Sequence, residues 1–482
     1  MDTLKEKTAK GLFWGGMNNG VQQAVGLVFG IILGRLLAPE DYGMMAMISV
    51  FSLVATALQN SGFTTALANL KSPRAEDYNS VFWLNIIVGV SLYVILFFCA
   101  PLIAGYYHTD KLIPLCRYAF LSIVIASFGT AQTAFLFKNL MVKQQAKAGM
   151  TAVIVSSMTG AAMAFGGMAY WSLATQGLVF VLTNTVMAWH YSHWRPTLRI
   201  DLRPAFHMFR FSSKILASTI AVHINNNVLN ILLGHYFSAR DTGNYNQAHQ
   251  WNFKCYSLVQ GMVSQVAQPV LVDLRDERER QLNALRKMVR FTAFIAFPLL
   301  LGFGLVAKEF IVIAITDKWL ASAALLQLLC ISGAVMPIST LLSNLVISKE
   351  KSGVYFWCTL ALCLLQIGLM MLLAPLGVQQ MVTGFTAVSA SWVFVWFYFA
   401  RRYSGYRLAS FLKDTLPFAL SALGVMTLTH FVTAGIANLW LLLLSRIAIA
   451  AALYYAVMRM AGAQILSECS AFIRQKMAGR QK

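Results

Sequence analysis

Long apolar segments follow one another along the whole chain, separated by short polar turns. An α-helix needs about 20 apolar residues to cross the ~30 Å hydrocarbon core of a membrane. Fourteen segments approach or exceed that length, at roughly residues 11–37, 42–69, 79–106, 112–137, 148–169, 171–191, 212–234, 249–271, 291–315, 320–347, 353–374, 378–399, 414–434 and 438–459. Because backbone polar groups in lipid must pair within their own segment, we expect helices. The sequence predicts an all-α polytopic membrane protein with about 14 transmembrane helices.

The composition agrees with this class. Of the 482 residues, 58% are hydrophobic and 12% are charged, whereas soluble domains carry about 25% charged residues. The net charge of +20 does not indicate nucleic-acid binding, because the basic residues lie between the apolar segments and form no patch. The seven cysteines have no metal or redox spacing, so we predict no disulfide framework, no metal site and no cofactor. The first apolar run is too long for a signal-peptide core.

Lysine and arginine predict the orientation in the membrane, because cytoplasmic loops carry the excess of both. With the N-terminus inside, 30 of the 38 basic residues fall in the tails and cytoplasmic loops, and eight fall in outer loops or spans. This division supports fourteen crossings with both termini cytoplasmic. The basic loops are also suited to contact with anionic membrane lipids.

An internal repeat suggests two lobes. Residues 33–43 resemble residues 233–243 at an offset of 200, with Leu, Gly, Asp and Gly identical. Six spans separate the copies, so both blocks have the same orientation, and a pseudo-twofold axis along the membrane normal would relate two six-helix lobes. Parallel repeats of this kind build transporters whose substrate site lies between the halves. The expected parts are an N-lobe (1–192), a C-lobe (193–402, with a cytoplasmic linker 193–211), and a region 403–482 with two C-terminal helices and a basic tail. Alternatively, the motif is a helix–turn–helix corner used twice, with Asp capping the second helix and Gly allowing the turn.

Acidic residues argue against ion relay and catalysis. All eighteen Asp and Glu residues lie in tails, loops or span ends. Intramembrane carboxylates are the usual proton or sodium relays, and paired carboxylates are the usual acid and base of glycosyl chemistry. No Ser/His/Asp or metal-ligand spacing is present either, so we predict that the chain is not an enzyme.

Polar residues inside the spans are amides and cations. Span 212–234 carries Thr219, His223, Asn226, Asn227 and Asn230 on one helical face. Span 11–37 is the repeat equivalent of span 212–234, and spans 42–69 and 249–271 follow these two along the chain. These three spans carry further amides: Asn18, Asn19, Gln22, Gln23, Gln59, Asn60, Gln260, Gln265 and Gln268. The candidate cations are Arg35, Arg117, Lys254 and Arg446.

Two interpretations of these residues stay open. Amides in spans often bond only to neighbouring helices, Arg35 and Arg117 could snorkel to the interface, and Arg446 could act only in packing. A water-filled cavity with cations and amide donors would instead suit an anionic, hydroxyl-rich substrate such as a diphosphate-linked sugar. We therefore predict substrate binding by Lys254, Arg35, Arg117, His223, Arg446, Asn18, Asn19, Gln22, Asn60, Asn226, Asn227, Asn230, Gln260 and Gln265.

Several short motifs are similar to the polysaccharide transport family of bacterial flippases, within the multidrug, oligosaccharidyl-lipid and polysaccharide exporter superfamily. They are Lys5-Glu6-Lys7-Thr8 with Gly11 and Trp14, the corner 34–43, Ser61-Gly62-Phe63, Trp194-Arg195-Pro196, residues 225–230, Asp317-Lys318-Trp319 and residues 326–330. The resemblance implies an inner-membrane flippase that carries undecaprenyl-diphosphate-linked oligosaccharide, such as an O-antigen or exopolysaccharide repeat unit, to the periplasmic leaflet by alternating access. By analogy with the family, polysaccharide polymerase machinery is a further candidate partner.

Four alternative functions make different demands on the sequence. A lipid-linked peptidoglycan precursor flippase also has fourteen spans and a cationic cavity, although the motifs favour polysaccharide export. A membrane polysaccharide polymerase or ligase should carry a large periplasmic loop, and a drug/cation antiporter should have twelve spans and an acidic cavity residue. A membrane scaffold would not need polar faces on repeat-equivalent helices.

Overall fold

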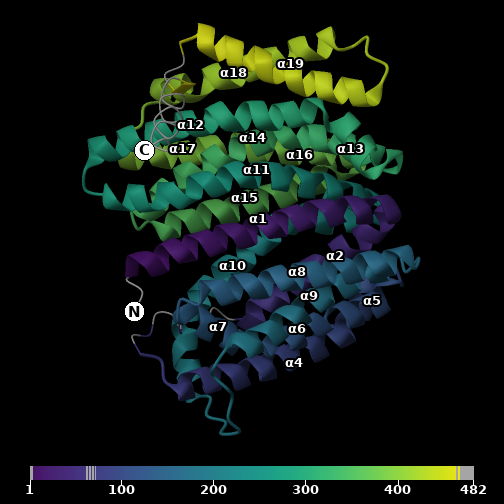
Figure 1. The fold of residues 1–482 in the computed structure, drawn as a ribbon, viewed down its shortest axis with the longest axis vertical. Helices are drawn as coiled ribbons and strands as arrows, with labels where there is room; N and C mark the ends of the chain where they lie inside the picture. Colours follow the sequence, from purple (N-terminus) through teal and green to yellow (C-terminus); the bar gives the residue numbers. More distant parts are fainter. Residues whose placement is uncertain are drawn as a thin grey trace, which may run out of the picture. The chain divides into compact units, whose positions relative to one another are not determined.

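The computed structural model describes residues 4–60, 63–64, 67, 70, 72–462 and 465–466, and the regular elements in these ranges are helices (Figure 1). They are α1 (Leu4–Leu36), α2 (Pro39–Asn60), α4 (Ala75–Tyr106), α5 (Leu112–Ala119), α6 (Leu121–Ser127), α7 (Thr130–Lys138), α8 (Val142–Phe165), α9 (Tyr170–Tyr191), α10 (Arg203–Tyr236), α11 (Ala239–Asp273), α12 (Arg278–Leu305), α13 (Ala307–Ile315), η1 (Asp317–Trp319), α14 (Leu320–Ser348), α15 (Ser352–Leu373), η2 (Ala374–Leu376), α16 (Val378–Ser391), α17 (Val393–Ser404), α18 (Leu408–Val432) and α19 (Leu439–Met460). The predicted motif residues Ser61 and Gly62 and the basic tail 467–482 lie outside the described residues.

Within the described residues, each of the fourteen predicted segments overlaps one helix or consecutive helices. Within the described ranges, nine helices are long and apolar enough to cross a membrane, and α5–α6 with α7, bent by 45°, would add a tenth. The other predicted spans correspond to α1, α9, α10 and α11, of which α1, α10 and α11 carry the predicted amides. The all-α membrane fold is confirmed, and the count of fourteen stays a prediction.

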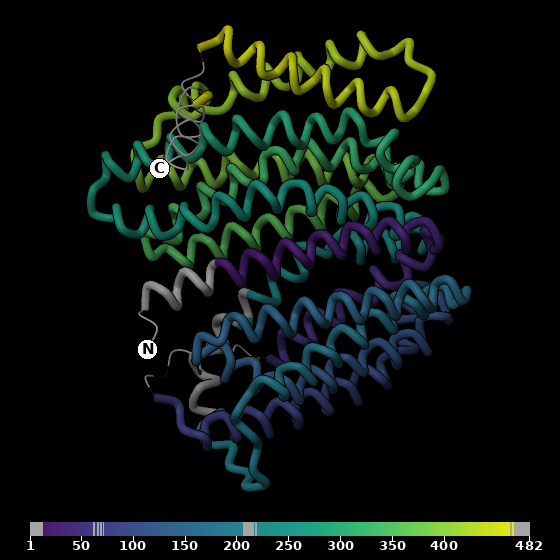
Figure 2. The backbone as a smooth tube through the Cα atoms, viewed as in Figure 1, coloured from purple at the N-terminus to yellow at the C-terminus, as the bar shows by residue number. Residues whose placement is uncertain are grey.

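The chain divides into two compact units, Met1–Asn246 and Gln247–Lys482. In the first unit, α8 packs along both α1 and α9, while α4 packs on α5 and α6, and α10 packs on α2 and α4 (Figure 2). Small residues allow close approach between these helices. A Cβ added at Gly89 of α4 would lie 2.8 Å from the Cβ of Ser127.

The segment between α9 and α10 is fastened to the start of α4. The Asn79 side chain accepts a hydrogen bond from the Thr197 N–H at 2.8 Å and donates to the Arg199 carbonyl at 2.5 Å. The Trp83 indole donates to the Thr197 carbonyl at 2.8 Å, and the Ala205 N–H donates to the Ser80 hydroxyl at 3.0 Å. These bonds fix the point at which α10 begins, so the predicted linker is an ordered part of the first unit.

In the second unit, α12 packs against α14 and against the hairpin of α18 and α19, which is yellow in Figure 1. A buried carboxylate anchors one end of this hairpin. Asp414 of α18 is 2% exposed and pairs with Arg286 at 2.7 Å and with Arg290 at 3.4 Å. The Tyr406 hydroxyl also donates to Asp414 at 2.8 Å. The sequence placed this acid at a span end and did not reveal its burial.

The repeated corners join α1 to α2 and α10 to α11. The Asp41 carboxylate accepts a hydrogen bond from the Ala38 N–H at 2.9 Å. At the second corner Asp241 accepts from the Ser238 N–H at 3.4 Å, and its own N–H donates to the Ser238 hydroxyl at 3.1 Å, which completes a capping box. The predicted capping role of Asp is confirmed in both copies.

The prediction that glycine allows the turn of each corner is wrong for the second glycine of both copies. Gly43 and Gly243 lie inside α2 and α11, four residues after each helix begins, and neither has a positive φ. A turn that needs the left-handed region therefore does not explain them. Their small size matters for packing.

The border between the compact units differs from the predicted lobe border. It falls after Asn246, inside α11, whereas the repeat suggested a border at residue 192. The contacts of α10 with α2 and α4 place α10 in the first unit. The repeat lobes stay a prediction about symmetry, and they are not the compact units of this conformation.

Candidate substrate-binding residues

The predicted polar face of α10 separates into bonded and open side chains. The Asn227 amide donates to the His223 carbonyl at 2.9 Å and accepts from the Asn230 amide at 3.4 Å. Asn230 is buried, and its side-chain oxygen has no hydrogen-bond partner among the described residues. Asn226 is exposed and His223 is half-buried. Asn226 and His223 are therefore the residues of this face best placed to meet a ligand.

The amides of α1 also divide into two groups. The Gln22 amide donates to the Asn18 oxygen at 3.0 Å, and both side chains face α8, where a Cβ added at Gly149 would lie 2.9 Å from the Asn18 oxygen. Asn19 and Gln23 are exposed. Asn18 and Gln22 thus support helix packing, while Asn19 is an exposed polar residue of α1.

Asn60 lies in a buried amide cluster that joins α2, α4 and α7. The Gln59 amide, which is fully buried, donates to the Asn85 oxygen at 2.9 Å and to the Thr130 hydroxyl at 2.8 Å. The Thr130 hydroxyl in turn lies 3.4 Å from the Asn60 oxygen. Sequence analysis missed Asn85 and Thr130, because a single Asn or Thr within an apolar span gives no periodic signal. Interhelical bonding is the simplest role for this cluster.

In the second unit, the Lys254 ammonium lies 4.3 Å from the centre of the Trp251 ring, three residues earlier on α11. A ring face attracts a cation, so this contact helps to hold the ammonium in place. Gln260 is half-buried and Gln265 is exposed on the same helix. Sequence analysis did not select Trp251, whose aromatic character is common in spans.

Two predicted arginines lie in the first unit at the ends of helices. Arg35 is exposed in the last turn of α1. Arg117 of α5 is half-buried, its guanidinium lies 4.3 Å from the centre of the Phe97 ring, and its Nε has no hydrogen-bond partner within the described part of the chain. Arg35 and Arg117 thus lie in different environments, one exposed and one against an aromatic ring. Snorkelling and ligand binding are both compatible with them.

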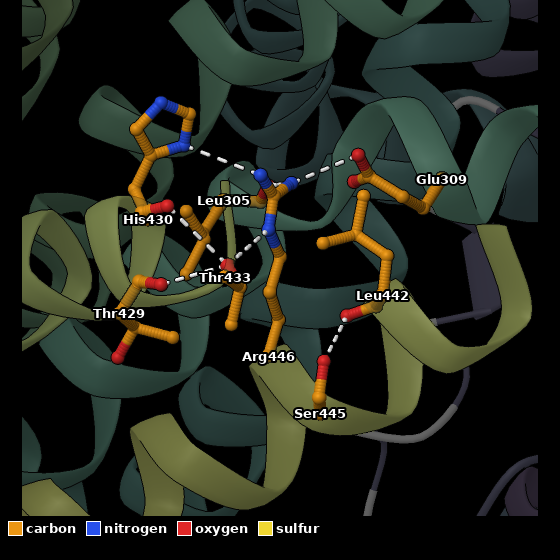
Figure 3. A network of polar contacts seen from close by, with 8 residues as sticks. All are labelled: Leu305, Glu309, Thr429, His430, Thr433, Leu442, Ser445 and Arg446. Carbon is orange, nitrogen blue, oxygen red and sulfur yellow. Dashed lines mark hydrogen bonds and ion pairs between the residues drawn. The ribbon is translucent and has the colours of Figure 1, made fainter. Parts of the chain in front are cut away.

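Arg446 has a different environment from the one predicted. Figure 3 shows its guanidinium surrounded by partners from α12, α13 and the α18 end of the hairpin. It donates to the Glu309 carboxylate at 2.8 Å, the Leu305 carbonyl at 3.1 Å and the Thr433 hydroxyl at 3.2 Å, and its third nitrogen lies 3.3 Å from a His430 ring nitrogen. The Arg446 and Glu309 side chains are 8% and 4% exposed. This network favours a structural role for Arg446 over the predicted substrate contact.

An apolar cavity of about 420 Å³ lies in the second unit between α12, α14, α16–α17 and α18. Phe297, Ile338 and Phe411 are among its lining residues, and no predicted site residue lines it. The polar candidates are therefore a feature separate from this cavity.

The structure thus brings together Asn18 with Gln22, and Asn227 with Asn230, as bonded pairs. Of the other predicted residues, Asn19, Asn226 and Arg35 in the first unit and Gln265 in the second are exposed, and His223 and Lys254 are half-buried. Among the residues described, no group of three or more His, Cys, Asp or Glu side chains is placed to hold a metal ion.

Known proteins place this chain in a family. Lipopolysaccharide biosynthesis protein WzxC of Escherichia coli is 24% identical over 73% of this chain and 72% of its own length. Succinoglycan biosynthesis transport protein ExoT of Rhizobium meliloti is 24% identical over 68% of this chain and 67% of its own. The solved structure of lipid II flippase MurJ in an inward closed conformation has a similar fold, with a TM-score of 0.77 at 14% identity over 94% of this chain and 100% of that one. The model of the polysaccharide biosynthesis protein family matches residues 32–324, which is more than half of the sequence, and the chain belongs to this family.

Proposed function

We propose that this protein is a flippase that moves undecaprenyl-diphosphate-linked polysaccharide repeat units from the cytoplasmic to the periplasmic leaflet of the bacterial inner membrane. Family membership supports the proposal, and similar proteins include a succinoglycan biosynthesis transport protein and, by fold, a lipid II flippase. We assign transport with no covalent step. Both termini lie in the cytoplasm in this proposal, following the distribution of Lys and Arg.

The exposed and half-buried polar residues match the chemistry of such a substrate. Sugar hydroxyls need donors and acceptors together, which the exposed amides of Asn19, Asn226 and Gln265 provide. A diphosphate needs cations, and we assign the Lys254 ammonium, which lies on the Trp251 ring, to this role. A polymerase that joins the units on the outer side is the partner class that this function requires.

Complementation tests the proposal. The wild-type chain is expressed in a strain that lacks a repeat-unit flippase, and surface polysaccharide is measured beside Lys254→Ala and His223→Ala at matched expression. Wild type should restore surface polymer, and both variants should reduce it. Lys254→Arg is the matched control for charge, and it should retain more activity than Lys254→Ala.

The alternative substrate has its own outcome. If wild type fails in several hosts with different repeat units but rescues depletion of a peptidoglycan-precursor flippase, the proposed substrate is wrong. If wild type and all variants rescue equally, the function stands and the proposed binding residues fall.

A further inference from the structure

The two repeated corners meet each other inside the first unit. A Cβ added at Gly43 would lie 1.7 Å from the Ala239 carbonyl oxygen, and one added at Gly243 would lie 1.8 Å from the Pro39 carbonyl oxygen. Each added atom would also lie within 3.0 Å of the backbone nitrogen of the other glycine. The first turns of α2 and α11 therefore touch backbone to backbone, with no room for a side chain between them.

This contact is reciprocal with respect to the repeat. Gly43 meets Ala239, the counterpart of Pro39 at the offset of 200, and Gly243 meets Pro39 itself. Such exchange of equivalent partners defines a twofold contact. The exposed ion pair between Glu40 and Arg240, at 3.7 Å, also joins two equivalent positions. A corner that was merely used twice would have no reason to touch its own copy, so the pseudo-twofold relation is built into this contact.

The chemistry of the contact suits a surface that parts and forms again. It depends on the shape of two glycine backbones and on an ion pair whose side chains are 64% and 47% exposed. Exposed ion pairs are weak because water replaces each partner readily. The ion pairs that anchor the α18–α19 hairpin, in contrast, each contain a carboxylate buried in the protein. The contact between the corners is therefore suited to separating and forming again, whereas the contacts of the hairpin are suited to staying closed.

A buried layer lies directly behind the glycines. A Cβ added at Gly234, one of the repeated glycines, would lie 2.7 Å from the Tyr107 ring and 2.9 Å from the Met47 side chain. The Tyr107 hydroxyl donates to the Met47 carbonyl at 3.1 Å, and Met47 is 1% exposed. Separation of the corners would uncover this layer, so Met47 is a sensitive reporter of whether they are together.

We propose that the Gly43–Gly243 contact is the outer gate of the transporter, closed in this structure and opened when substrate leaves on the outer side. The proposal rests on the proposed function, because a gate has meaning only in a chain that moves a substrate. It also accounts for the border between the compact units. The corner of the second repeat groups with the first unit because it is docked on the first corner.

Accessibility of residue 47 tests the gate without any substrate. With the seven cysteines replaced, Met47→Cys is labelled in intact cells with a membrane-impermeant maleimide. Labelling should be slow in this background and several-fold faster when Gly43→Ala or Gly243→Ala is added, because the methyl group forces the corners apart. Gly105→Ala is the matched control, since a Cβ at that outer-end glycine of α4 meets no atom within 4 Å. Equal labelling of the glycine variants and this control overturns the proposal.

Two further measurements keep the gate testable if the glycine variants fold poorly. Arg240→Glu places two carboxylates across the contact and should also speed labelling of residue 47, whereas an unchanged rate contradicts the gate. Cysteines at positions 40 and 240, joined by a reducible bifunctional methanethiosulfonate, should stop restoration of surface polymer, and reduction should recover it. Continued transport by the linked protein overturns the proposal. Faster labelling in a chain that never restores polymer would instead contradict the proposed substrate, while still showing that the contact between the corners opens.

Discussion

Removal of Arg446 is expected to destabilise the protein without a direct effect on substrate recognition. Its guanidinium makes three hydrogen bonds, to Glu309, Leu305 and Thr433, and a fourth polar contact to His430, while the second Glu309 oxygen is buried without a hydrogen-bond partner in the described structure. In Arg446→Met the Glu309 carboxylate would stay buried with no compensating charge. Breaking a buried pair in this way costs about 3–5 kcal/mol of folding stability.

A double-mutant cycle measures this coupling. We expect Arg446→Met and Glu309→Gln each to lower the midpoint of thermal aggregation in detergent, followed by fluorescence-detected size-exclusion chromatography. The double variant should recover much of the loss, because neither buried charge remains. Arg459→Met is the matched control, since Arg459 is exposed near the end of the same helix. An Arg446→Met protein with the wild-type midpoint and no transport per folded molecule would refute the structural role and restore Arg446 as a substrate contact.

Lys254→Ala should lower transport more than Asn226→Ala at equal amounts of folded protein, because losing a cation from a diphosphate site costs more than losing one amide; surface polymer per molecule measures both, and equal losses would contradict this ranking. Gly149→Leu should reduce the yield of monodisperse protein, because an added Cβ would already lie 2.9 Å from the Asn18 oxygen, and a wild-type yield would show that α1 and α8 separate freely. The Arg275 hydrogen bond lowers the pKa of the Glu350 carboxyl below its ordinary 4.5, so this pair contributes stability above that pH and loses it as the pH falls through the lowered value. Because both groups are exposed, Glu350→Gln should match the thermal midpoint of wild type at pH 7, and a clear drop would show that the pair matters more than its exposure implies.

The lengths of the apolar segments predicted the helices well, because a segment in lipid has few other ways to pair its backbone N–H and C=O groups. The extent of α11 was less predictable. This helix begins at Ala239, ten residues before the predicted span, and its first turns are rich in buried polar side chains such as Asn244 and Gln247. A search for apolar residues passes over such turns, although they are helical and packed.

Contacts between residues far apart in the chain could not be predicted from the sequence. Glu309 and Arg446 are separated by 137 positions, and each by itself resembles a residue at a membrane interface. The division of the α1 amides was equally hidden, since Asn18 and Asn19 are neighbours in sequence but only Asn18 faces Gly149. Periodicity shows which residues share a face, and it does not show which neighbouring helix covers that face. The repeat indicated the corners, but only the three-dimensional structure shows that they touch.

Direct observation of flipping tests the central claim. The purified chain is reconstituted into liposomes with a fluorescent oligosaccharide on undecaprenyl diphosphate, and an impermeant glycosidase reports the fraction of sugar in the outer leaflet. Protein should make nearly all of the substrate accessible over time, whereas Lys254→Ala and protein-free liposomes should leave an inaccessible fraction. If wild-type liposomes behave as protein-free ones for several repeat units, yet expose a lipid-linked peptidoglycan precursor, this chain is not a polysaccharide repeat-unit flippase.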